Sequence, residues 1–522
     1  MFHHAQGFPQ YAIMNSYEAE ELEFKKHVKP VLISDIPPDA NVISSHTVYK
    51  IKMEENNQLR LKARIAPHGN EDSMKDQLKT DCCMCSPIGI RIILTIATIM
   101  KWAIARADAK AAFMKTGRAE RDVYVKPPRE SLDKMYYWLL LVSAYGLVNS
   151  NAKWQHHSDE VMFNIGLQHL SVIAQLFYQM KDGKLALIVI KIVDYLLMTG
   201  EKSYMDNFIR QFNDKFQFGT VIHGPGILKF FGLTIIQNTD FSCTVHGDEK
   251  LMALEVFPLP RTRRRQPDSE LSDYEKSSYM SVNSSLSWLG ITASPLCAFI
   301  SSYLQQKLPD LNVDSIISQC KYLRLLKSYG TSIHYPVPPK SGCHNISILV
   351  FSDAGRVIDR GQLSFFAGLL IGPFAQDSQF YVLSWSSHKS KRPVKSVGAA
   401  EILAASEAID EGKVLKQALS TLLGIPLRLI IALDSLDLFT ALSTQKNSID
   451  KSIRADVNVI RYEYETQHAD DMIWIPGRVN LTDPGTKTDS PLTQAMIQTM
   501  ACGKLSIDLS EAEARSSDRS LG

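Results

Sequence analysis

The strongest constraint on this chain is a carboxylate placed at the end of an apolar segment. Residues 185–192, LALIVIKI, are apolar apart from Lys191, and Asp194 follows them in the stretch KIVDYLLMTG. This pattern predicts a buried strand, a turn and a second strand. A carboxylate in such a place is costly unless it is paired, hydrogen-bonded or bound to a metal ion. The sequence therefore predicts a special role for Asp194.

Other acidic residues lie in comparable positions. They end predicted strands, follow the last strand, or lie early on a predicted helix: Asp108 in WAIARAD, Asp353 in ISILVFSD, Asp434 in LRLIIALD, Glu401 in AAEILAA and Asp483 in NLTDPGTK. Two-metal phosphoryl transfer needs such a set, because two Mg²⁺ ions about 4 Å apart require several hard oxygen ligands. The alternative for any single acid is a helix cap or a turn aspartate.

Composition excludes several classes of protein. The chain has 522 residues, 45% hydrophobic and 21% charged, which is ordinary for a globular protein of two to four domains. The net charge of +2 gives no bulk basic signal, so a nucleic-acid site would have to be a local patch. The eight cysteines form no disulfide framework. Without a secretory signal or a membrane-spanning segment, we expect an intracellular protein, cytoplasmic or nuclear.

The order of predicted elements changes along the chain. Residues 1–27 are expected to be a ragged leader, and residues 48–53 and 59–65 a β-hairpin. Residues 256–274 combine proline with basic and acidic residues, which predicts an exposed linker, and residues 275–340 are helical in character. After residue 345 the order is βββαβαβ, which predicts a mixed sheet with helices on its faces.

Several motifs resemble one family. RADAKAAFMKTGRAERDVYVKPP (106–128), SAYGLVNSNAKW (143–154), KIVDYLLMTG and LKFFGLTI (228–235) resemble the reverse transcriptase of copia-type LTR retrotransposon Pol polyproteins. SDAG, LDSLDLF and IPGRVNLTDPGTK resemble the ribonuclease H domain of the same polyproteins. The resemblance runs from about residue 28 to 488, and the order and spacing of the motifs make it specific.

The resemblance implies a fold and a division into domains. The fold would be mixed α+β: a right-hand polymerase with fingers, palm and thumb, then a connecting region and a ribonuclease H-like domain. The expected parts are a leader (1–27), fingers and palm (28–240), a thumb or connection-like region (241–345), a ribonuclease H-like domain (346–490) and a C-terminal tail (491–522). The chain would then be a fragment of a longer polyprotein.

The resemblance also implies roles for particular residues. Asp108 and Asp194 would bind the metal ions of the polymerase, and Phe113 would be the aromatic gate that excludes a ribose 2′-hydroxyl. Lys62 and Arg64 would contact triphosphate oxygens. The ribonuclease H metal ligands would be Asp353, Glu401, Asp434 and Asp483. The implied cofactor is Mg²⁺, two ions per active site, and the implied partners are an RNA template, an RNA–DNA hybrid and deoxynucleoside triphosphates.

The chain departs from the family pattern at chemistry-bearing positions. Tyr195 stands where the family has a second hairpin aspartate, and a phenol, with a pKa of about 10, is a poor Mg²⁺ ligand. His68 stands where the family usually has an arginine or a lysine, and Val148 and Asn149 replace a Lys-Gln pair. An impaired polymerase beside a complete ribonuclease H quartet is the expected result. The alternatives are a non-catalytic nucleic-acid-binding relic and an unrelated metal-dependent nuclease.

Overall fold

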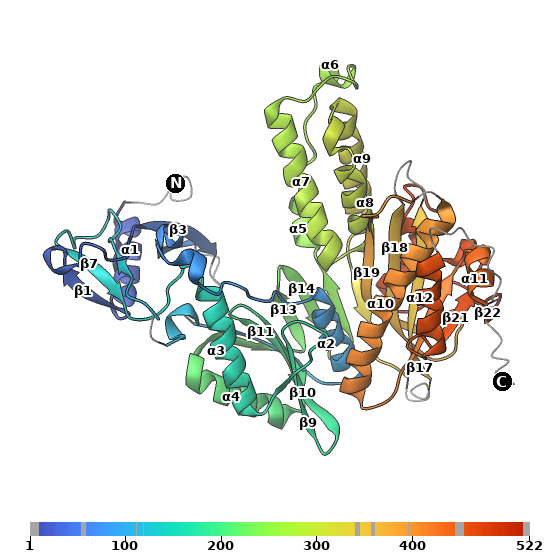
Figure 1. The fold of residues 1–522 in the computed structure, drawn as a ribbon, viewed down its shortest axis with the longest axis horizontal. Coiled ribbons are helices and arrows are strands. Elements are labelled where there is room, and N and C mark those ends of the chain that lie inside the picture. Colours follow the sequence, from blue (N-terminus) through green and yellow to red (C-terminus); the bar gives the residue numbers. More distant parts are fainter. Residues whose placement is uncertain are drawn as a thin grey trace.

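The computed structural model describes residues 10–53, 59–110, 112–117, 120–339, 345–355, 361–394, 396–443 and 454–514. Figure 1 shows an N-terminal lobe, a central sheet, a projecting pair of helices and a C-terminal sheet covered by helices. The predicted mixed α+β class is confirmed.

The N-terminal lobe is built around a small sheet with the strand order β1-β7-β6-β2. Its elements are α1 (Gln10–Lys25), β1 (Val28–Leu32), β2 (Val42–Ile43), β6 (Tyr124–Val125) and β7 (Tyr136–Leu140). The expectation of a ragged leader was wrong for residues 10–25, because Tyr17 and Phe24 of α1 are each 1% exposed and join the core around Trp138. The predicted hairpin forms from β3 (Ser45–Met53) and β4 (Leu59–Pro67), and its connecting residues 54–58 lie outside the described ones.

The central sheet has the order β12-β5-β11-β10-β9-β8. Its strands are β5 (Ile104–Ala109), β8 (Gln168–His169), β9 (Leu176–Lys181), β10 (Lys184–Ile192), β11 (Tyr195–Gly200) and β12 (Phe218–His223). One face packs on α2 (Pro87–Met100), the other on α3 (Ser150–Ile165) and α4 (Lys202–Phe216). Alternate residues of β10 enter different cores: Ile188 and Ile190 lie with α2, Leu187 and Val189 with α3 and α4. Burial on both faces explains the unbroken apolar run.

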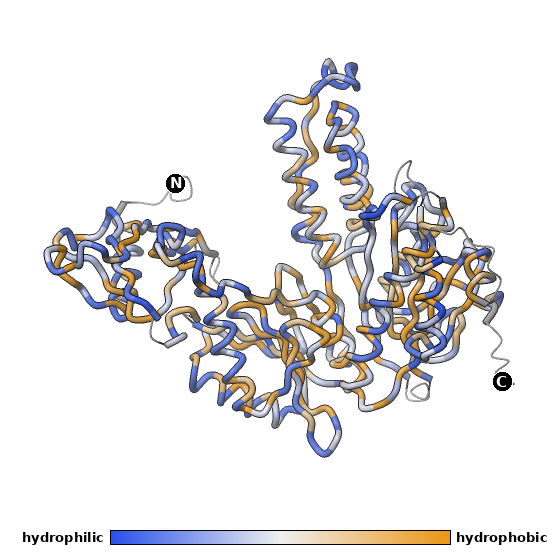
Figure 2. The backbone as a smooth tube through the Cα atoms, in the orientation of Figure 1, coloured by the Kyte–Doolittle hydropathy of each residue, from blue (hydrophilic) through white to orange (hydrophobic). Residues whose placement is uncertain are grey.

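A smaller sheet and a helical arm follow. The sheet has the order β13-β14-β15-β16: β13 (Gly226–Phe230), β14 (Leu233–Gln237), β15 (Cys243–His246) and β16 (Ile333–Tyr335). The helices are α5 (Asp248–Ala253), α6 (Arg261–Arg264), α7 (Asp273–Thr292), α8 (Pro295–Gln305) and α9 (Val313–Tyr329). Helices α7 and α9 project from the body, with α6 at the far end, which is hydrophilic in Figure 2.

The predicted exposed linker, residues 256–274, is mostly exposed, as expected. It also contains the short helix α6, and Arg263 of that helix pairs with Glu275 at 2.9 Å. Ser272 caps α7 in a reciprocal arrangement with the same Glu275. Two arginines of the basic run are thus engaged by the protein itself: Arg263, and Arg264, whose Nε donates to the Leu259 carbonyl at 3.0 Å.

The C-terminal sheet has the order β19-β18-β17-β20-β21-β22. Its elements are β17 (Ile346–Gly355), β18 (Gln362–Ile371), β19 (Gln379–Lys389), α10 (Val397–Leu423), β20 (Arg428–Leu433), α11 (Leu436–Ser443), α12 (Arg454–Glu465), β21 (Asp471–Trp474), α13 (Thr493–Cys502) and β22 (Glu513–Ala514). Strand β17 pairs antiparallel with β18 and parallel with β20, which confirms the predicted mixed sheet. The segment expected to be a tail is structured up to residue 514, since α13 and β22 belong to it and Leu505 is fully buried.

Helix α2 connects the central sheet to the C-terminal sheet. Its Arg91 is 4% exposed, and the guanidinium donates to the carbonyl oxygens of Leu383 in β19 and of Ile291 and Thr292 at the end of α7. The same guanidinium lies 3.6 Å from the ring centroid of Trp385. Apolar residues of α2, β10, α7 and β17–β19 form one continuous core. Three parts of the chain that are distant in sequence are therefore packed as one body.

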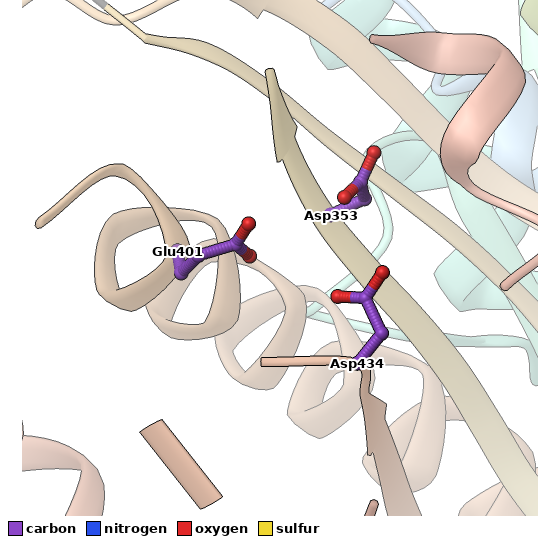
Figure 3. Close-up of side chains that lie close together, drawn as sticks. All are labelled: Asp353, Glu401 and Asp434. Carbon is purple, nitrogen blue, oxygen red and sulfur yellow. The ribbon is translucent and has the colours of Figure 1, made fainter. Parts of the chain in front are cut away.

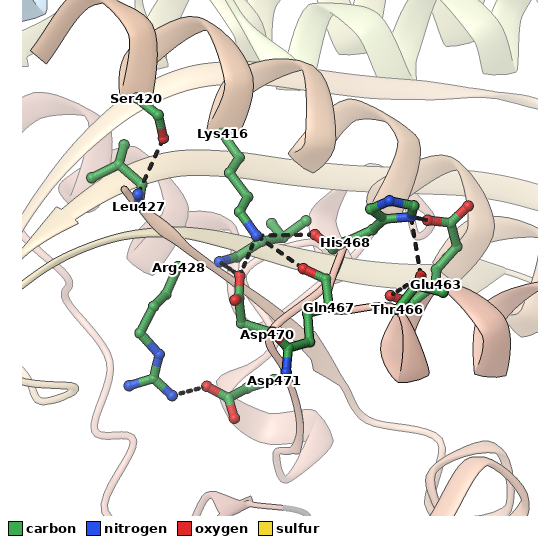
Figure 4. A network of polar contacts seen from close by, with 11 residues as sticks. Lys416, Ser420, Leu427, Arg428, Glu463, Thr466, Gln467, His468, Asp470 and Asp471 are labelled. Atoms are coloured by element: carbon green, nitrogen blue, oxygen red, sulfur yellow. Dashed lines mark hydrogen bonds and ion pairs between the residues drawn. The ribbon is translucent and has the colours of Figure 1, made fainter. Parts of the chain in front are cut away.

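A polar network ties α10 to the loop before β21 (Figure 4). One oxygen of Asp470 accepts hydrogen bonds from Lys416 at 2.6 Å and from the backbone N–H of buried Leu429 at 2.7 Å. The neighbouring Asp471 pairs only with Arg428, which is 61% exposed, among the interactions drawn. The two adjacent carboxylates thus have very different surroundings.

We expect Asp470→Ala to lower the free energy of unfolding by about 1–3 kcal/mol, because it leaves the Leu429 N–H buried without its acceptor. Asp471→Ala is the matched control and should change it by less than about 1 kcal/mol, as is usual for an exposed ion pair. Urea unfolding of both variants measures the difference. Equal losses would contradict this assignment of the network.

Candidate metal centre

Three carboxylates converge at one edge of the C-terminal sheet. Asp353 is near the end of β17, Asp434 directly follows β20, and Glu401 lies in the second turn of α10. Because β17 and β20 run parallel, with Ser352 opposite Leu433, the two aspartates leave the sheet at the same edge. Figure 3 shows the three side chains pointing toward one another. One oxygen from each lies within 4.8 Å of the others.

The carboxylates are buried and repel one another. Asp353 is 3% exposed and Glu401 9%. Burial, with the nearby charge of Asp434, raises the pKa of Asp353 to about 6. Burial, with the charges of Asp353 and Asp434, raises the pKa of Glu401 to about 9. Burial also raises the pKa of Asp434. The three groups cannot all ionise at neutral pH without a compensating positive charge.

The donor set fits a hard divalent cation. All three ligand atoms are carboxylate oxygens, the donors that Mg²⁺ prefers in proteins, and neither histidine nor cysteine belongs to the group. A bound cation would offset the burial and the neighbouring negative charges that raise the pKa values of Asp353 and Glu401. Three of the four acids predicted for this domain therefore form a buried triad, and its donor chemistry suits magnesium.

Asp483, the fourth predicted acid, lies beside the triad but outside the group. It begins a 3-10 turn (Asp483–Gly485), and its carboxylate contacts the ammonium of Lys487. The hydroxyl of Thr486 donates to Asp353. Burial acts to lower the pKa of Lys487, but Asp483, Asp353 and Asp434 together raise it. Sequence reasoning missed Thr486 and Lys487, although both lie within four residues of Asp483 in NLTDPGTK.

A second pair of acids lies at the central sheet. Asp108 is on β5 and is paired with Tyr195 of the neighbouring β11, and the Ala109 N–H donates to the Asp194 carbonyl at 2.8 Å. Of the two aspartates predicted to be the polymerase ligands, Asp108 therefore lies on β5 and Asp194 in the turn that precedes the neighbouring β11. Burial and the charges of Asp194 and Asp108 raise the pKa of Tyr195, which is 42% exposed. Tyr195 thus follows Asp194 in the sequence and is paired with Asp108 across the sheet, and its phenol is neutral.

The predicted nucleotide-binding residues gather around Tyr145. The Phe113 ring, 8% exposed, meets the Tyr145 ring edge-on at 4.7 Å, and the Arg64 guanidinium lies 4.2 Å from the centroid of the same ring. Lys62 is exposed and lies two residues from Arg64 on β4, so both point to one face of the hairpin. The structure thus brings Phe113 and Arg64 together through Tyr145, a residue to which the sequence analysis gave no role.

In the part of the chain that the structure describes, no helix has both the length and the apolar character needed to cross a bilayer.

Comparison with known proteins finds a family match for part of the chain. Residues 30–246 match the family described as "Reverse transcriptase (RNA-dependent DNA polymerase)". This match confirms the predicted resemblance for that part of the chain, and it ends before the C-terminal sheet begins. A solved foamy viral protease-reverse transcriptase dRH, in complex with double-stranded DNA, is similar over 83% of this chain at 9% identity and a TM-score of 0.45. The match covers 65% of that solved chain, so this chain spans less than two thirds of its length.

Proposed function

We propose that this chain is a reverse transcriptase and ribonuclease H module in which cleavage of the RNA strand of an RNA–DNA hybrid is the retained activity. The observation that carries the proposal is the buried group of Asp353, Glu401 and Asp434, whose oxygens lie within 4.8 Å of one another. The reverse transcriptase match over residues 30–246 supplies the context in which such a site acts on nucleic acid.

The triad would hold two Mg²⁺ ions, with Asp483 as the outermost ligand. When bound, the ions activate the attacking water and stabilise the leaving oxygen of the phosphodiester. The chain's own residues position the ligands: Thr486 donates to Asp353, and the Asn480 amide donates to the Ser352 carbonyl at 2.9 Å. Lys487 holds Asp483 by an ion pair and brings a positive charge close to Asp353, where a phosphate would be attracted.

The polymerase is impaired in this proposal. Asp108 and Asp194 remain, but Tyr195 replaces the second hairpin aspartate and contributes a neutral phenol. The expected partners are an RNA template and an RNA–DNA hybrid, bound through phosphate contacts and groove shape. Deoxynucleoside triphosphates would bind in contact with Lys62, Arg64 and Phe113. In this proposal residues 28–240 form the fingers and palm, residues 241–345 the thumb or connection-like region, and residues 346–490 the ribonuclease H-like domain. The chain would act in the cytoplasm or nucleus.

A second function has a specific observation in its favour. Tyr195 and the altered residues Val148 and Asn149 suit a non-catalytic relic that keeps the fold and binds nucleic acid. The two functions differ in whether the acidic triad cleaves the RNA strand of an RNA–DNA hybrid.

The test is a Mg²⁺-dependent assay on a labelled RNA–DNA hybrid, run beside primer extension on the same purified full chain. We expect hybrid cleavage without extension. A folded chain, judged by its circular dichroism spectrum, that shows neither activity would favour the relic. Efficient extension would contradict the impaired polymerase.

A further inference from the structure

The carboxylate of Asp108 is already engaged by the protein. Arg106, two residues earlier on β5 and so on the same face of the strand, places Nη2 4.0 Å from Asp108 Oδ1. The same oxygen accepts a hydrogen bond from the Thr220 backbone N–H at 3.1 Å. A Cβ atom built on Gly219 would lie 2.5 Å from Oδ2, so the backbone of β12 packs closely against the second oxygen. Both oxygens of Asp108 therefore face protein atoms.

The backbone of β12 is shaped around this carboxylate. The pairing of β12 with β5 is shifted between Phe218 and Val221, and Gly219 and Thr220 are the residues in the irregular segment. Such a bulge re-aims the local backbone groups. Here it turns the Thr220 N–H toward Asp108 and leaves room for the carboxylate only because residue 219 lacks a side chain.

The Arg106 guanidinium is fixed in place. Its side chain is 17% exposed, and Nη1 donates to the Lys229 carbonyl of β13 at 2.8 Å. The ring of Tyr195 lies 5.8 Å from the guanidinium carbon, within the range of a cation–π contact. A permanently charged group is thus held between a backbone carbonyl, an aromatic ring and Asp108.

The two acidic sites differ in the ligands they offer. The C-terminal triad presents three carboxylates, and its neighbouring cation, Lys487, contacts the outer Asp483. The central sheet presents Asp108 and Asp194, and within the described ranges no third acid, histidine or cysteine completes a metal-binding group with them. A divalent ion there would face a guanidinium beside one ligand and a neutral phenol beside the other.

We infer that the central-sheet acids of this chain do not take up a divalent cation, because Arg106 supplies the positive charge at Asp108 and Tyr195 withholds a ligand. The inference rests on the proposed assignment of Asp108 and Asp194 as the polymerase acids. It goes beyond the loss of one aspartate, since it predicts that a carboxylate restored at position 195 will not bind a divalent cation while Arg106 remains.

Mn²⁺ binding measured by electron paramagnetic resonance tests this without any activity assay. The full chain carrying Asp353→Asn and Asp434→Asn, which silence the triad, is the reference. When Tyr195→Asp is introduced into this reference chain, we expect the Mn²⁺ affinity to change by less than about 3-fold. When Tyr195→Asp and Arg106→Gln are introduced together, we expect the Mn²⁺ affinity to rise by at least about 10-fold. Tyr195→Asp with Arg106→Lys keeps the charge and should give no gain.

Three results would overturn the inference. The first is a full gain from Tyr195→Asp alone, and the second is no gain from the Arg106→Gln combination in a chain that melts normally. Asp108→Asn in the reference chain is a milder change that should leave Mn²⁺ binding unaltered, and a loss of bound Mn²⁺ there would also overturn it. Hybrid cleavage by the parent chain is read separately, so failure here and failure of the proposed function remain distinguishable.

Discussion

Asp353→Asn is expected to lower the rate of Mg²⁺-dependent hybrid cleavage by at least about 10³-fold, equivalent to roughly 4 kcal/mol of transition-state stabilisation. Asp353 is the most deeply buried member of the triad and accepts a hydrogen bond from Thr486. An amide can hydrogen-bond in the same place, but it carries no charge for a metal ion. Initial cleavage rates on a labelled hybrid measure the effect.

The control separates lost chemistry from lost structure. Asp471→Asn removes one negative charge from the same sheet, at an ion pair with exposed Arg428, and should leave cleavage unchanged. Asp353→Asn also removes a source of repulsion on Glu401, so its melting temperature without divalent cations should equal or exceed that of the parent. Parent-like cleavage by the Asp353→Asn chain would show that the activity arises elsewhere.

The second large effect concerns stability and pH. The pKa of Glu401 is raised from 4.5 to about 9, so between these values the unfolded chain releases a proton that the folded chain retains. Stability from this group is therefore fully present below the ordinary value and is lost as the pH rises toward about 9. Without divalent cations, we expect the melting temperature to fall over this window, and Glu401→Gln to raise it by roughly 5–10 °C near the upper end.

Melting curves in a chelator, with and without millimolar Mg²⁺, measure this effect. Magnesium should raise the melting temperature of the parent most at high pH, because the carboxyl groups of the triad lose their protons most easily there. Magnesium should raise the melting temperature of the Glu401→Gln chain far less. Asp471→Asn is a suitable comparison, because it alters an acid of the same sheet that lies outside the triad and pairs with an exposed arginine. A parent chain whose melting temperature rises steadily from about pH 5 to about pH 9 would contradict the assigned cause.

The sequence was most informative where burial dictated the pattern. Apart from Lys191, the run of residues 185–192 is apolar on both faces of the sheet. Asp353 and Asp434 lie at the ends of neighbouring parallel strands, so their convergence follows from topology. Helix α1 was missed because its buried anchors, Tyr17 and Phe24, are separated by mostly polar residues. The contact of Arg106 with Asp108 was also missed. Their spacing of two places them on one face of β5, but the sequence could not distinguish an inward guanidinium from a solvated one.

Parts of the site depended on segments that only the fold brings together. Thr220 and Gly219 reach Asp108 through a bulge more than a hundred residues away in sequence. Tyr145, which joins Phe113 to Arg64, comes from a segment whose neighbours depart from the family pattern. Such contacts depend on strand register, and no local pattern encodes it.

Helix α2 has a consequence for how such a chain can decay. Arg91 satisfies carbonyls of β19 and α7, and the apolar residues of α2 belong to the same core as both large sheets. Deleting α2 together with the central sheet would expose apolar residues of the C-terminal sheet to solvent and would leave those carbonyls without the Arg91 donor. Under the proposed function, a chain that no longer extends primers would still need residues 28–240 as a scaffold. Substitutions at Asp108 and its surroundings would then be tolerated, whereas deletion of this part would lower the stability of the C-terminal sheet.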